Sequence, residues 1–288
     1  MTKILLLGST GQVGQELLRT LPSLGEVITL TRQDLDFSQP ENIFDSVAEI
    51  SPDIIVNSSA YTAVDKAETD ADTATMVNAK APEALAKAAQ SMGAKLVHIS
   101  TDYVFDGTNH TPYKETDSTN PLGVYGRSKL EGEEAVKQCD RHVILRTAWV
   151  YGSRGHGNFV KTMLRLGKER TELKVVADQI GSPTWSYDIA EAIANLLSND
   201  VESGIYHFAS SGVASWYDFA VAIFAEAKQL GYPLKIESVL PITTADYPTP
   251  AKRPHYSVLS KAKYTDAAEI YPPYWRDSLM KMLQELSI

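Results

Sequence analysis

The sequence predicts an α/β protein with a doubly wound parallel sheet and a smaller C-terminal domain. Short apolar runs alternate with segments of helical period over the first two thirds of the 288 residues. Continuous apolar runs of this kind are typical of parallel strands that helices cover on both faces. After residue 200 the alternation gives way to an aromatic helix and a proline-rich loop, which indicates a second, smaller unit.

The expected strands are short runs rich in Ile, Leu and Val, at residues 3–7, 26–30, 53–57, 95–99, 142–146 and 173–177. Ser38, followed by Pro40 and Glu41, predicts a capped helix start. The alanine-rich segment 76–92 predicts a helix that ends at Gly93. Later segments predict a strand, a helix with aromatic side chains in the core, and a long loop, at 204–208, 215–231 and 240–254, before two terminal helices.

Composition excludes several classes of function. The chain has 27 basic and 36 acidic residues, a net charge of −9, and no basic run long enough to follow a phosphate backbone. We therefore expect no nucleic-acid partner. The single cysteine, Cys139, cannot form an internal disulfide, which favours a reducing compartment. The N-terminal apolar run meets Gly8 too early for a signal peptide, and no stretch of about 18 apolar residues predicts a membrane span. These features predict a soluble cytoplasmic protein.

Three glycines, Gly8, Gly11 and Gly14, lie between the first expected strand and the first expected helix. Glycine permits a tight turn, close approach of backbone N–H groups to a pyrophosphate, and close packing of helix on strand. A plain strand-to-helix turn would also explain the glycines, but the strand before and the helix after favour dinucleotide binding in a Rossmann-type fold. The GxxGxxG spacing resembles that of the extended short-chain dehydrogenase/reductase superfamily.

The second expected strand ends at Thr31 and Arg32, where NAD-binding proteins often place an acidic residue. A hydroxyl followed by a guanidinium suits a 2′-phosphate, so we expect NADPH, with NADH as a possible substitute. Two alternatives stay open, because Asp34 lies near the position of an NAD-binding acid and Arg32 could be a plain surface charge. In the superfamily, an Asp and an apolar residue after a short third strand contact the adenine, and Asp36 and Phe37 match that pair.

Tyr125 and Lys129 lie four residues apart, on one face of the helix expected after the strand at 95–99. A tyrosine hydroxyl is a poor acid at neutral pH unless a nearby cation stabilises its phenolate, and Lys129 can supply that cation. Thr101, at the end of the strand, can donate a hydrogen bond to a substrate oxygen. The spacing alone arises often by chance, but its place at the carboxyl end of a parallel strand indicates a catalytic set around a carbonyl group.

The six histidines are scattered along the chain, with no cysteine or histidine spacing typical of a metal site. His98 and His207 lie within expected strands, so we expect both to be structural.

Several segments together resemble the dTDP-4-dehydrorhamnose reductase family of the extended superfamily, and AYTAVDKAE and STDYVFDG are the most specific of them. The other segments are 8–17, 77–86, 120–133, 145–152, 178–184, 204–212 and 253–259. The resemblance implies a catalytic role for Thr101, Tyr125 and Lys129. It also implies a cofactor site lined by Gly8, Gln12, Val13, Asp36, Phe37, Ala60, Tyr61 and Thr62. The sugar would face Asp102, Tyr103, Trp149 and Asn158. Some relatives hold magnesium between subunits with acidic residues, but no such set matches here, so we expect no metal.

The family implies hydride transfer from NADPH to the C4 ketone of a dTDP-linked 6-deoxy-hexulose. The nucleotide diphosphate needs local cations, for which Lys252 and Arg253 are candidates, with plain solvent exposure as the alternative. Two rival functions remain: another sugar-nucleotide epimerase or dehydratase that recycles bound NAD, and a non-catalytic regulatory subunit resembling that of methionine adenosyltransferase. A regulatory subunit would have no need of a proton donor such as Tyr125, so the presence of Thr101, Tyr125 and Lys129 together argues against that alternative.

We expect residues 1–150 to bind NADP, with residues 172–200 returning to that domain, and residues 151–288 to bind mainly substrate. A homodimer is a further expectation.

Overall fold

Parallel strands form the main sheet of the computed structural model, which describes residues 1–286. The 6-stranded sheet has the order β10-β5-β4-β3-β1-β2. In that order the strands are Gly204–His207, His142–Thr147, Lys95–Thr101, Ile54–Asn57, Lys3–Leu7 and Glu26–Leu30. The prediction of a doubly wound parallel sheet is confirmed, and the carboxyl ends of β1, β3 and β4 meet at one edge.

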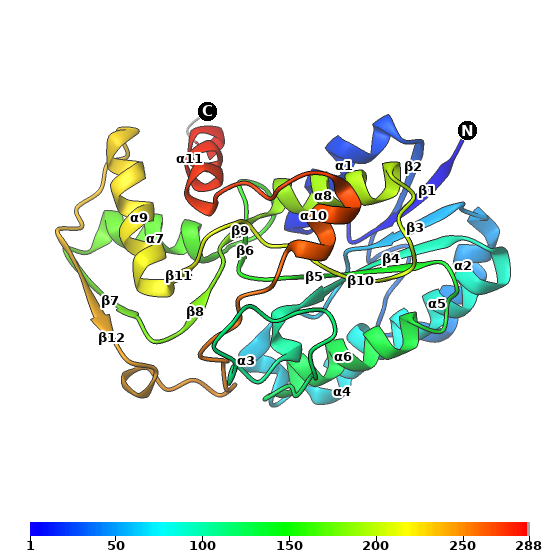
Figure 1. Ribbon diagram of the computed structural model, residues 1–288, viewed down its shortest axis with the longest axis horizontal. Coiled ribbons are helices and arrows are strands. Elements are labelled where there is room, and N and C mark those ends of the chain that lie inside the picture. Colours follow the sequence, from blue (N-terminus) through cyan, green and yellow to red (C-terminus); the bar gives the residue numbers. More distant parts are fainter. Residues whose placement is uncertain (287–288) are drawn as a thin grey trace.

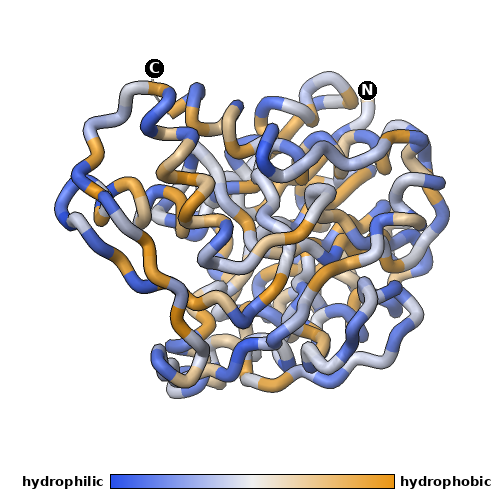
Figure 2. The backbone as a smooth tube through the Cα atoms, turned by 60° about the vertical axis from the view of Figure 1, so that its left-hand side comes forward, coloured by the Kyte–Doolittle hydropathy of each residue, from blue (hydrophilic) through white to orange (hydrophobic). Residues whose placement is uncertain are grey.

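Helices cover both faces of this sheet (Figure 1). On one face pack α1, α8 and α10, which span Gln12–Thr20, Ser186–Ser198 and Ala262–Ala268. On the other face pack α2, α5 and α6, which span Ile43–Ile50, Ala81–Met92 and Val124–Val136. Short helices α3 (Val64–Ala67) and α4 (Ala71–Thr75) and a π-helical turn at Met76–Lys80 lead from β3 into α5. Hydrophobic stretches of the chain cross the interior, as the tube in Figure 2 shows.

A smaller lobe, on the left in Figure 1, has its own core. Its helices are α7 (Phe159–Glu169), α9 (Trp216–Gln229) and α11 (Trp275–Leu286). Short strand pairs connect and flank them: β7 with β12 (Glu172–Val176 and Ser238–Ile242), β6 with β9 (Val150–Tyr151 and Thr184–Trp185), and β8 with β11 (Ile180–Gly181 and Ala214–Ser215). Phe219 and Phe224 of α9 are buried in this core, so the expectation for the aromatic helix is confirmed.

The run at 173–177 forms a strand, but its expected place in the main sheet is wrong. Strand β7 pairs with β12 in the smaller lobe, and β10 instead lies beside β5. The reason is visible in its burial: Leu173 is buried, whereas Glu172 and Lys174 are exposed. The alternation of exposed Glu172 and Lys174 with buried Leu173 and Val175 suits a strand that is covered on one face only.

One other local expectation was also wrong. Ser38 does not cap a helix, because its hydroxyl donates to Asp36 Oδ1 at 2.8 Å; a 3-10 turn at Pro40–Asn42 precedes α2 instead. No strand lies between β2 and β3 within the described chain, so Asp36 and Phe37 do not follow a short third strand here. By contrast, Gly93 ends α5 in the left-handed conformation, as expected, with φ 67°. Over residues 1–286, no helix combines the length and apolar character needed to span a bilayer.

Candidate active site

The turn between β1 and α1 packs so closely that two of its positions accept only glycine. Gly8 is left-handed, with φ +81°, and a Cβ atom there would lie 2.7 Å from Ser59 N. A Cβ atom at Gly14 would collide with Gly8 O. Gly11 precedes α1, whose first turn carries no acidic side chain, so the helix N-terminus is suited to an anion. This cradle fits the pyrophosphate of a dinucleotide.

At the carboxyl end of β2, Thr31 and Arg32 lie where the sequence predicted them. The N–H and hydroxyl of Thr31 donate to Asp34 Oδ2 at 2.8 and 2.7 Å, so Asp34 is used within the turn. The hydrogen bonds from Thr31 lower the pKa of Asp34. The Arg32 side chain is 80% exposed, and its Nε lies 3.5 Å from Asp36 Oδ2. Arg32 is thus exposed at this edge, and among the described residues only the long contact with Asp36 engages its guanidinium.

Other residues expected near the cofactor differ in accessibility. Phe37 is buried in the core between the sheet and α2, which argues against a wide contact of its ring with adenine. Val13 packs partly against the core on the opposite face. Ala60, Tyr61 and Thr62 follow β3 and retain solvent-accessible surface.

Thr101, Tyr125 and Lys129 meet at the carboxyl end of β4. Thr101 Oγ1 donates to Asp102 Oδ1 at 3.1 Å and accepts from Tyr103 N at 3.2 Å, and Thr101 lies close enough to Tyr125 to influence its pKa. Tyr125 lies in the first turn of α6, and Lys129 follows one turn later with its side chain buried. The structure therefore places Thr101 near Tyr125 at this edge of the sheet, with Lys129 one turn further along α6.

Burial dominates the acid–base behaviour of this group. It raises the pKa of Tyr125 to about 12, a rise that the hydrogen bond with Thr101 opposes and the Asp102 carboxylate reinforces. Burial also lowers the pKa of Lys129 to about 8, against the opposing charge of Glu133. Lys129 Nζ donates to Ile99 O at 2.7 Å and lies 3.2 Å from His98 Nε2. Lys129 is thus turned toward β4, and its effect on the Tyr125 pKa remains a prediction.

Helix α6 is held in place by groups outside the catalytic set. Glu68 Oε1 accepts from Val124 N at 2.8 Å and so caps the helix. The Asn78 amide donates to Ser128 Oγ at 3.1 Å and to Tyr61 O at 3.0 Å. Asn78 thereby joins α6 to the segment that follows β3.

A buried ion pair fastens the same helix to the sheet. Glu133 Oε1 and Oε2 accept from Arg146 Nε and a terminal nitrogen of Arg146 at 2.9 and 2.6 Å, and both side chains are almost fully buried. Ser100 Oγ donates to Glu133 Oε1 at 2.5 Å. Arg146 also lies 3.4 Å from His207 Nε2, and burial lowers the pKa of His207 to about 3. His207 is a structural, neutral histidine, as expected.

Two of the expected sugar-binding residues adjoin the catalytic group. Asp102 is buried, and burial raises its pKa to about 6, against hydrogen bonds from Ser257 and Thr101. The Tyr103 ring meets the Tyr125 ring edge-to-face, with centroids 5.5 Å apart.

Trp149 has a positive φ of 49° and stacks on Trp216, with ring centroids 3.6 Å apart and 4° between the planes. A left-handed tryptophan costs backbone energy, which is typical of functional sites. Trp216 Nε1 donates to Gln179 Oε1 at 3.2 Å, which fixes the stack.

Asn158 contacts the phosphate turn. Its side-chain amide donates to Gln12 Oε1 at 2.7 Å and to Gly152 O at 2.8 Å, while its oxygen caps α7 by accepting from Lys161 N. Both the NH₂ group and the oxygen of the Asn158 amide therefore form hydrogen bonds within the protein.

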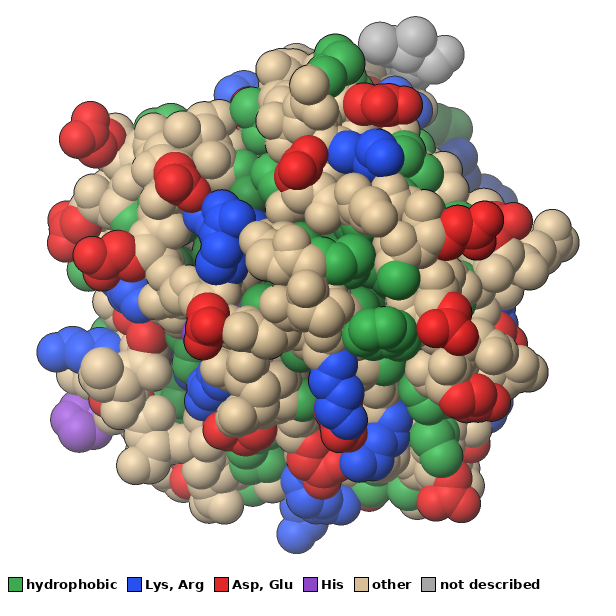
Figure 3. Space-filling model, turned by 90° about the vertical axis from the view of Figure 1, so that its right-hand side faces the viewer, with side chains coloured by type: hydrophobic (Ala, Val, Ile, Leu, Met, Phe, Trp, Pro, Cys, Tyr) green, Lys and Arg blue, Asp and Glu red, His purple; other side chains and the backbone are tan. Residues whose placement is uncertain are grey.

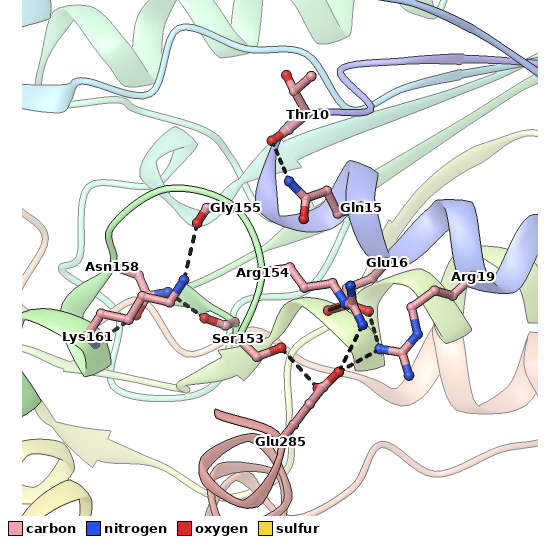
Figure 4. A network of polar contacts seen from close by, with 11 residues as sticks. Thr10, Gln15, Glu16, Arg19, Ser153, Arg154, Gly155, Asn158, Lys161 and Glu285 are labelled. Carbon is pink, nitrogen blue, oxygen red and sulfur yellow. Dashed lines mark hydrogen bonds and ion pairs between the residues drawn. The ribbon is translucent and has the colours of Figure 1, made fainter. Parts of the chain in front are cut away.

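Figure 4 shows how the following loop and α11 are tied to α1. Glu285 of α11 accepts from Ser153 Oγ and from Arg19 at 3.0 Å each, and from Arg154 at 3.5 Å. Glu16 of α1 is fully buried and accepts from Arg19 at 2.7 Å; burial raises its pKa. The two lobes are thus joined beside the glycine turn.

The two cations of the proline-rich segment have different surroundings. The guanidinium of Arg253 donates to both carboxylate oxygens of Asp65, at 3.0 and 2.8 Å. Asp65 therefore balances its charge in this structure, and a role for Arg253 at the substrate diphosphate remains a prediction. Lys252 is exposed to solvent. Asp65 lies on α3, far away in sequence, and so the pairing could not be seen before folding.

Comparison with known proteins identifies the family. The sequence model of the RmlD substrate binding domain matches residues 1–288. dTDP-4-dehydrorhamnose reductase of Escherichia coli K12 is 46% identical, over 98% of this chain and 97% of its own length. The chain belongs to the dTDP-4-dehydrorhamnose reductase family.

Solved structures of family members agree with the fold. The reductase from Clostridium acetobutylicum has a TM-score of 0.93 and 41% identity, and each chain is covered over 100% of its length. The reductase from Bacillus anthracis, solved in complex with NADP, has a TM-score of 0.92 and 38% identity, over 99% of this chain and 100% of that one. The resemblance inferred from the segments is confirmed, and the findings support the reductase over the epimerase and regulatory-subunit alternatives.

Sequence reasoning missed several residues that shape this reductase-family site, namely Asn57, Glu68, Asn78, His98 and Glu133. Glu133 lies one helical turn after Lys129, which was a usable signal. The others come from separate segments with no spacing relation. Among residues 1–286, no group of three or more His, Cys, Asp or Glu side chains is arranged to hold a metal ion.

Proposed function

We propose that this chain is an NADPH-dependent reductase that converts the C4 ketone of dTDP-4-dehydro-L-rhamnose into the alcohol of dTDP-L-rhamnose. The observation that carries the proposal is the meeting of Thr101, Tyr125 and Lys129 beside a glycine cradle, in a chain of this reductase family. We assign dinucleotide binding mainly to residues 1–150 and substrate binding mainly to residues 151–288.

The residues of the first lobe fit NADPH. Gly8, Gly11, Gln12 and Gly14 would hold the pyrophosphate, because a side chain at Gly8 would block the turn. The exposed guanidinium of Arg32 would bind the 2′-phosphate. The NADP complex of the Bacillus anthracis relative supports this choice of cofactor. When bound, NADPH supplies the hydride that reduces C4.

The chain itself supplies the proton and polarises the ketone. Tyr125 carries its proton throughout the neutral range, because its pKa is raised to about 12, and it donates that proton to the C4 oxygen. Thr101 would turn its hydroxyl hydrogen from Asp102 Oδ1 to the same oxygen. Lys129, as an ammonium ion, favours the phenolate that Tyr125 leaves behind and holds the nicotinamide ribose.

The substrate is a dTDP-sugar. Asp102, Tyr103 and Trp149 are proposed to contact the hexose, with Asn158 near the phosphate turn, and Lys252 to offset the diphosphate charge. We further propose a cytoplasmic protein, assembled as a homodimer, with no nucleic-acid partner. Acidic and basic side chains are interspersed on the face shown in Figure 3, which supports the last point.

The test is a spectrophotometric assay of NADPH oxidation on addition of dTDP-4-dehydro-L-rhamnose. We expect one NADPH consumed per ketone reduced, and little NAD in the purified protein. Tyr125→Phe should bind NADPH normally but lose orders of magnitude in kcat. Stoichiometric bound NAD with sugar interconversion and no net nicotinamide change would instead identify an epimerase.

A further inference from the structure

His98 lies beneath the proposed catalytic lysine and has no part in the function described so far. It is fully buried on β4, as is Asn57 on β3. The two residues are opposite each other in the strand register, and His98 Nδ1 lies 3.1 Å from Asn57 Nδ2. On its other side, His98 Nε2 lies 3.2 Å from Lys129 Nζ. The imidazole is thus held between two nitrogen atoms.

The orientation of the Asn57 amide follows from a backbone group. Ser59 N donates to Asn57 Oδ1 at 3.0 Å, and a backbone N–H can only donate. The oxygen of Asn57 therefore faces Ser59, and its NH₂ group faces His98. It follows that His98 Nδ1 accepts a hydrogen bond and carries no hydrogen of its own.

A neutral imidazole has one N–H group, which must then be on Nε2. His98 remains neutral because burial holds its pKa well below the ordinary value, and any positive charge on Lys129 lowers that pKa further. Its Nε2 hydrogen points at Lys129 Nζ, which also donates to Ile99 O at 2.7 Å. Nζ can accept from His98 only if it has a lone pair, that is, as an amine.

An ammonium ion at this position leaves two donors facing each other. If His98 carries its hydrogen on Nδ1 instead, the Asn57 amide must turn, and its NH₂ group then faces Ser59 N–H. Only the amine satisfies all contacts of Lys129, His98, Asn57 and Ser59 at once.

The charged surroundings of Lys129 are consistent with an easily lost proton. Glu133 on the same helix favours the ammonium ion, but Arg146 of β5 pairs with that carboxylate. The other titratable groups at this end of the sheet are Asp102, Tyr103, Tyr125 and His207.

We propose that His98 is a positioning residue that donates its Nε2 hydrogen to Lys129 and so stabilises the neutral amine of Lys129 against the ammonium ion. His98 thereby decides at which pH Lys129 loses its charge. Where the proposed function holds, this pH limits reduction on the alkaline side, since the ammonium ion is the form that favours the Tyr125 phenolate.

The first test needs only the purified wild-type chain. Nitrogen-15 NMR distinguishes the two imidazole tautomers, and we expect the hydrogen of His98 on Nε2. In protein labelled with carbon-13 at lysine Cε, the signal that is absent from Lys129→Arg reports the titration of Lys129. We expect it to titrate well below the ordinary value of about 10.4. A hydrogen on Nδ1, or titration at the ordinary value, would overturn the proposal.

The second test compares His98→Leu with His142→Leu, which removes a histidine at the amino end of the neighbouring strand β5. Loss of the His98 donor should raise the Lys129 pKa by about one unit, and loss of His142 should leave it unchanged. An unchanged Lys129 pKa in folded His98→Leu would refute the role. If His98→Leu does not fold, the variant Asn57→Asp is tested instead. A carboxylate at position 57 accepts a hydrogen bond from His98 Nδ1, so the imidazole hydrogen lies on Nδ1 and Nε2 becomes an acceptor for Lys129. Asn57→Asp should therefore also raise the Lys129 pKa.

The kcat–pH profile of the same variants separates this inference from the proposed function. We expect the alkaline limb to move upward with the Lys129 pKa in His98→Leu. If the Lys129 pKa rises in His98→Leu but the alkaline limb of the kcat–pH profile stays at the same pH, the His98 assignment remains intact and the role of Lys129 in the reduction is overturned.

Discussion

Removal of either partner of the Arg146–Glu133 pair should destabilise the protein more than any surface substitution. The two side chains are 2% and 0% exposed, and two hydrogen bonds of 2.9 and 2.6 Å join them. Replacement of Arg146 by Met leaves the Glu133 carboxylate buried with only the hydrogen bond from Ser100. Loss of one partner of a buried pair costs about 3–5 kcal/mol, because an uncompensated charge stays in the interior. The free energy of unfolding should fall by that amount.

Urea unfolding, followed by tryptophan fluorescence and by circular dichroism, measures the change. The double variant Arg146→Met with Glu133→Leu removes both charges. Its loss in free energy of unfolding should therefore be about 3 kcal/mol smaller than the sum of the losses in the two single variants. Lys87→Met is the matched control, since Lys87 pairs with Glu83 on the exposed face of α5, and such pairs contribute about 1 kcal/mol or less. A loss below about 1 kcal/mol for Arg146→Met, or strict additivity in the double variant, would refute the reasoning.

Three further predictions concern the site. Arg32→Ala should weaken NADPH binding about tenfold to a hundredfold and NADH binding little, because a charge-assisted contact to the 2′-phosphate contributes about 1.5–3 kcal/mol. Equal losses of affinity for NADPH and NADH in titration calorimetry would exclude that contact. Asp102→Asn should stabilise the protein at pH 7 by about 3 kcal/mol, since the pKa of Asp102 rises from 3.8 to about 6 on folding, and folding stability is lost as the pH rises through that window. In urea unfolding, the gain in the free energy of unfolding should vanish below pH 4. A gain that does not change with pH would contradict titration of Asp102 as its cause. Asp65→Asn should raise KM for the dTDP-sugar, because it releases Arg253 and the segment around it, and an unchanged KM would show that the Asp65–Arg253 pair does not shape the site.

The sequence by itself determined most of the main sheet, the glycine turn and the spacing of the proposed catalytic pair. Apolar runs at 3–7, 53–57 and 95–99 are buried on both faces, so only a covered parallel sheet can hold them. Gly8 and Gly14 are required within the turn itself, because Gly8 is left-handed, with φ +81°, and a Cβ atom at Gly14 would collide with Gly8 O. Tyr125 and Lys129 share a helical face, which follows from spacing alone. Local periodicity and steric limits are properties of short segments, and a sequence displays them directly.

Only the tertiary structure decided what these groups contact. His98 and Asn57 are 41 residues apart, and the register of β3 with β4 places them together beneath Lys129. Asp65 and Arg253 are 188 residues apart, so nothing in either segment revealed that Arg253 is neutralised. Strand β7 pairs with β12 outside the main sheet, where the exposed side chains of Glu172 and Lys174 alternate with buried Leu173 and Val175, and β10 lies beside β5 instead. Protonation states and charge balance depend on burial and on partners distant in the chain, and those exist only once the chain has folded.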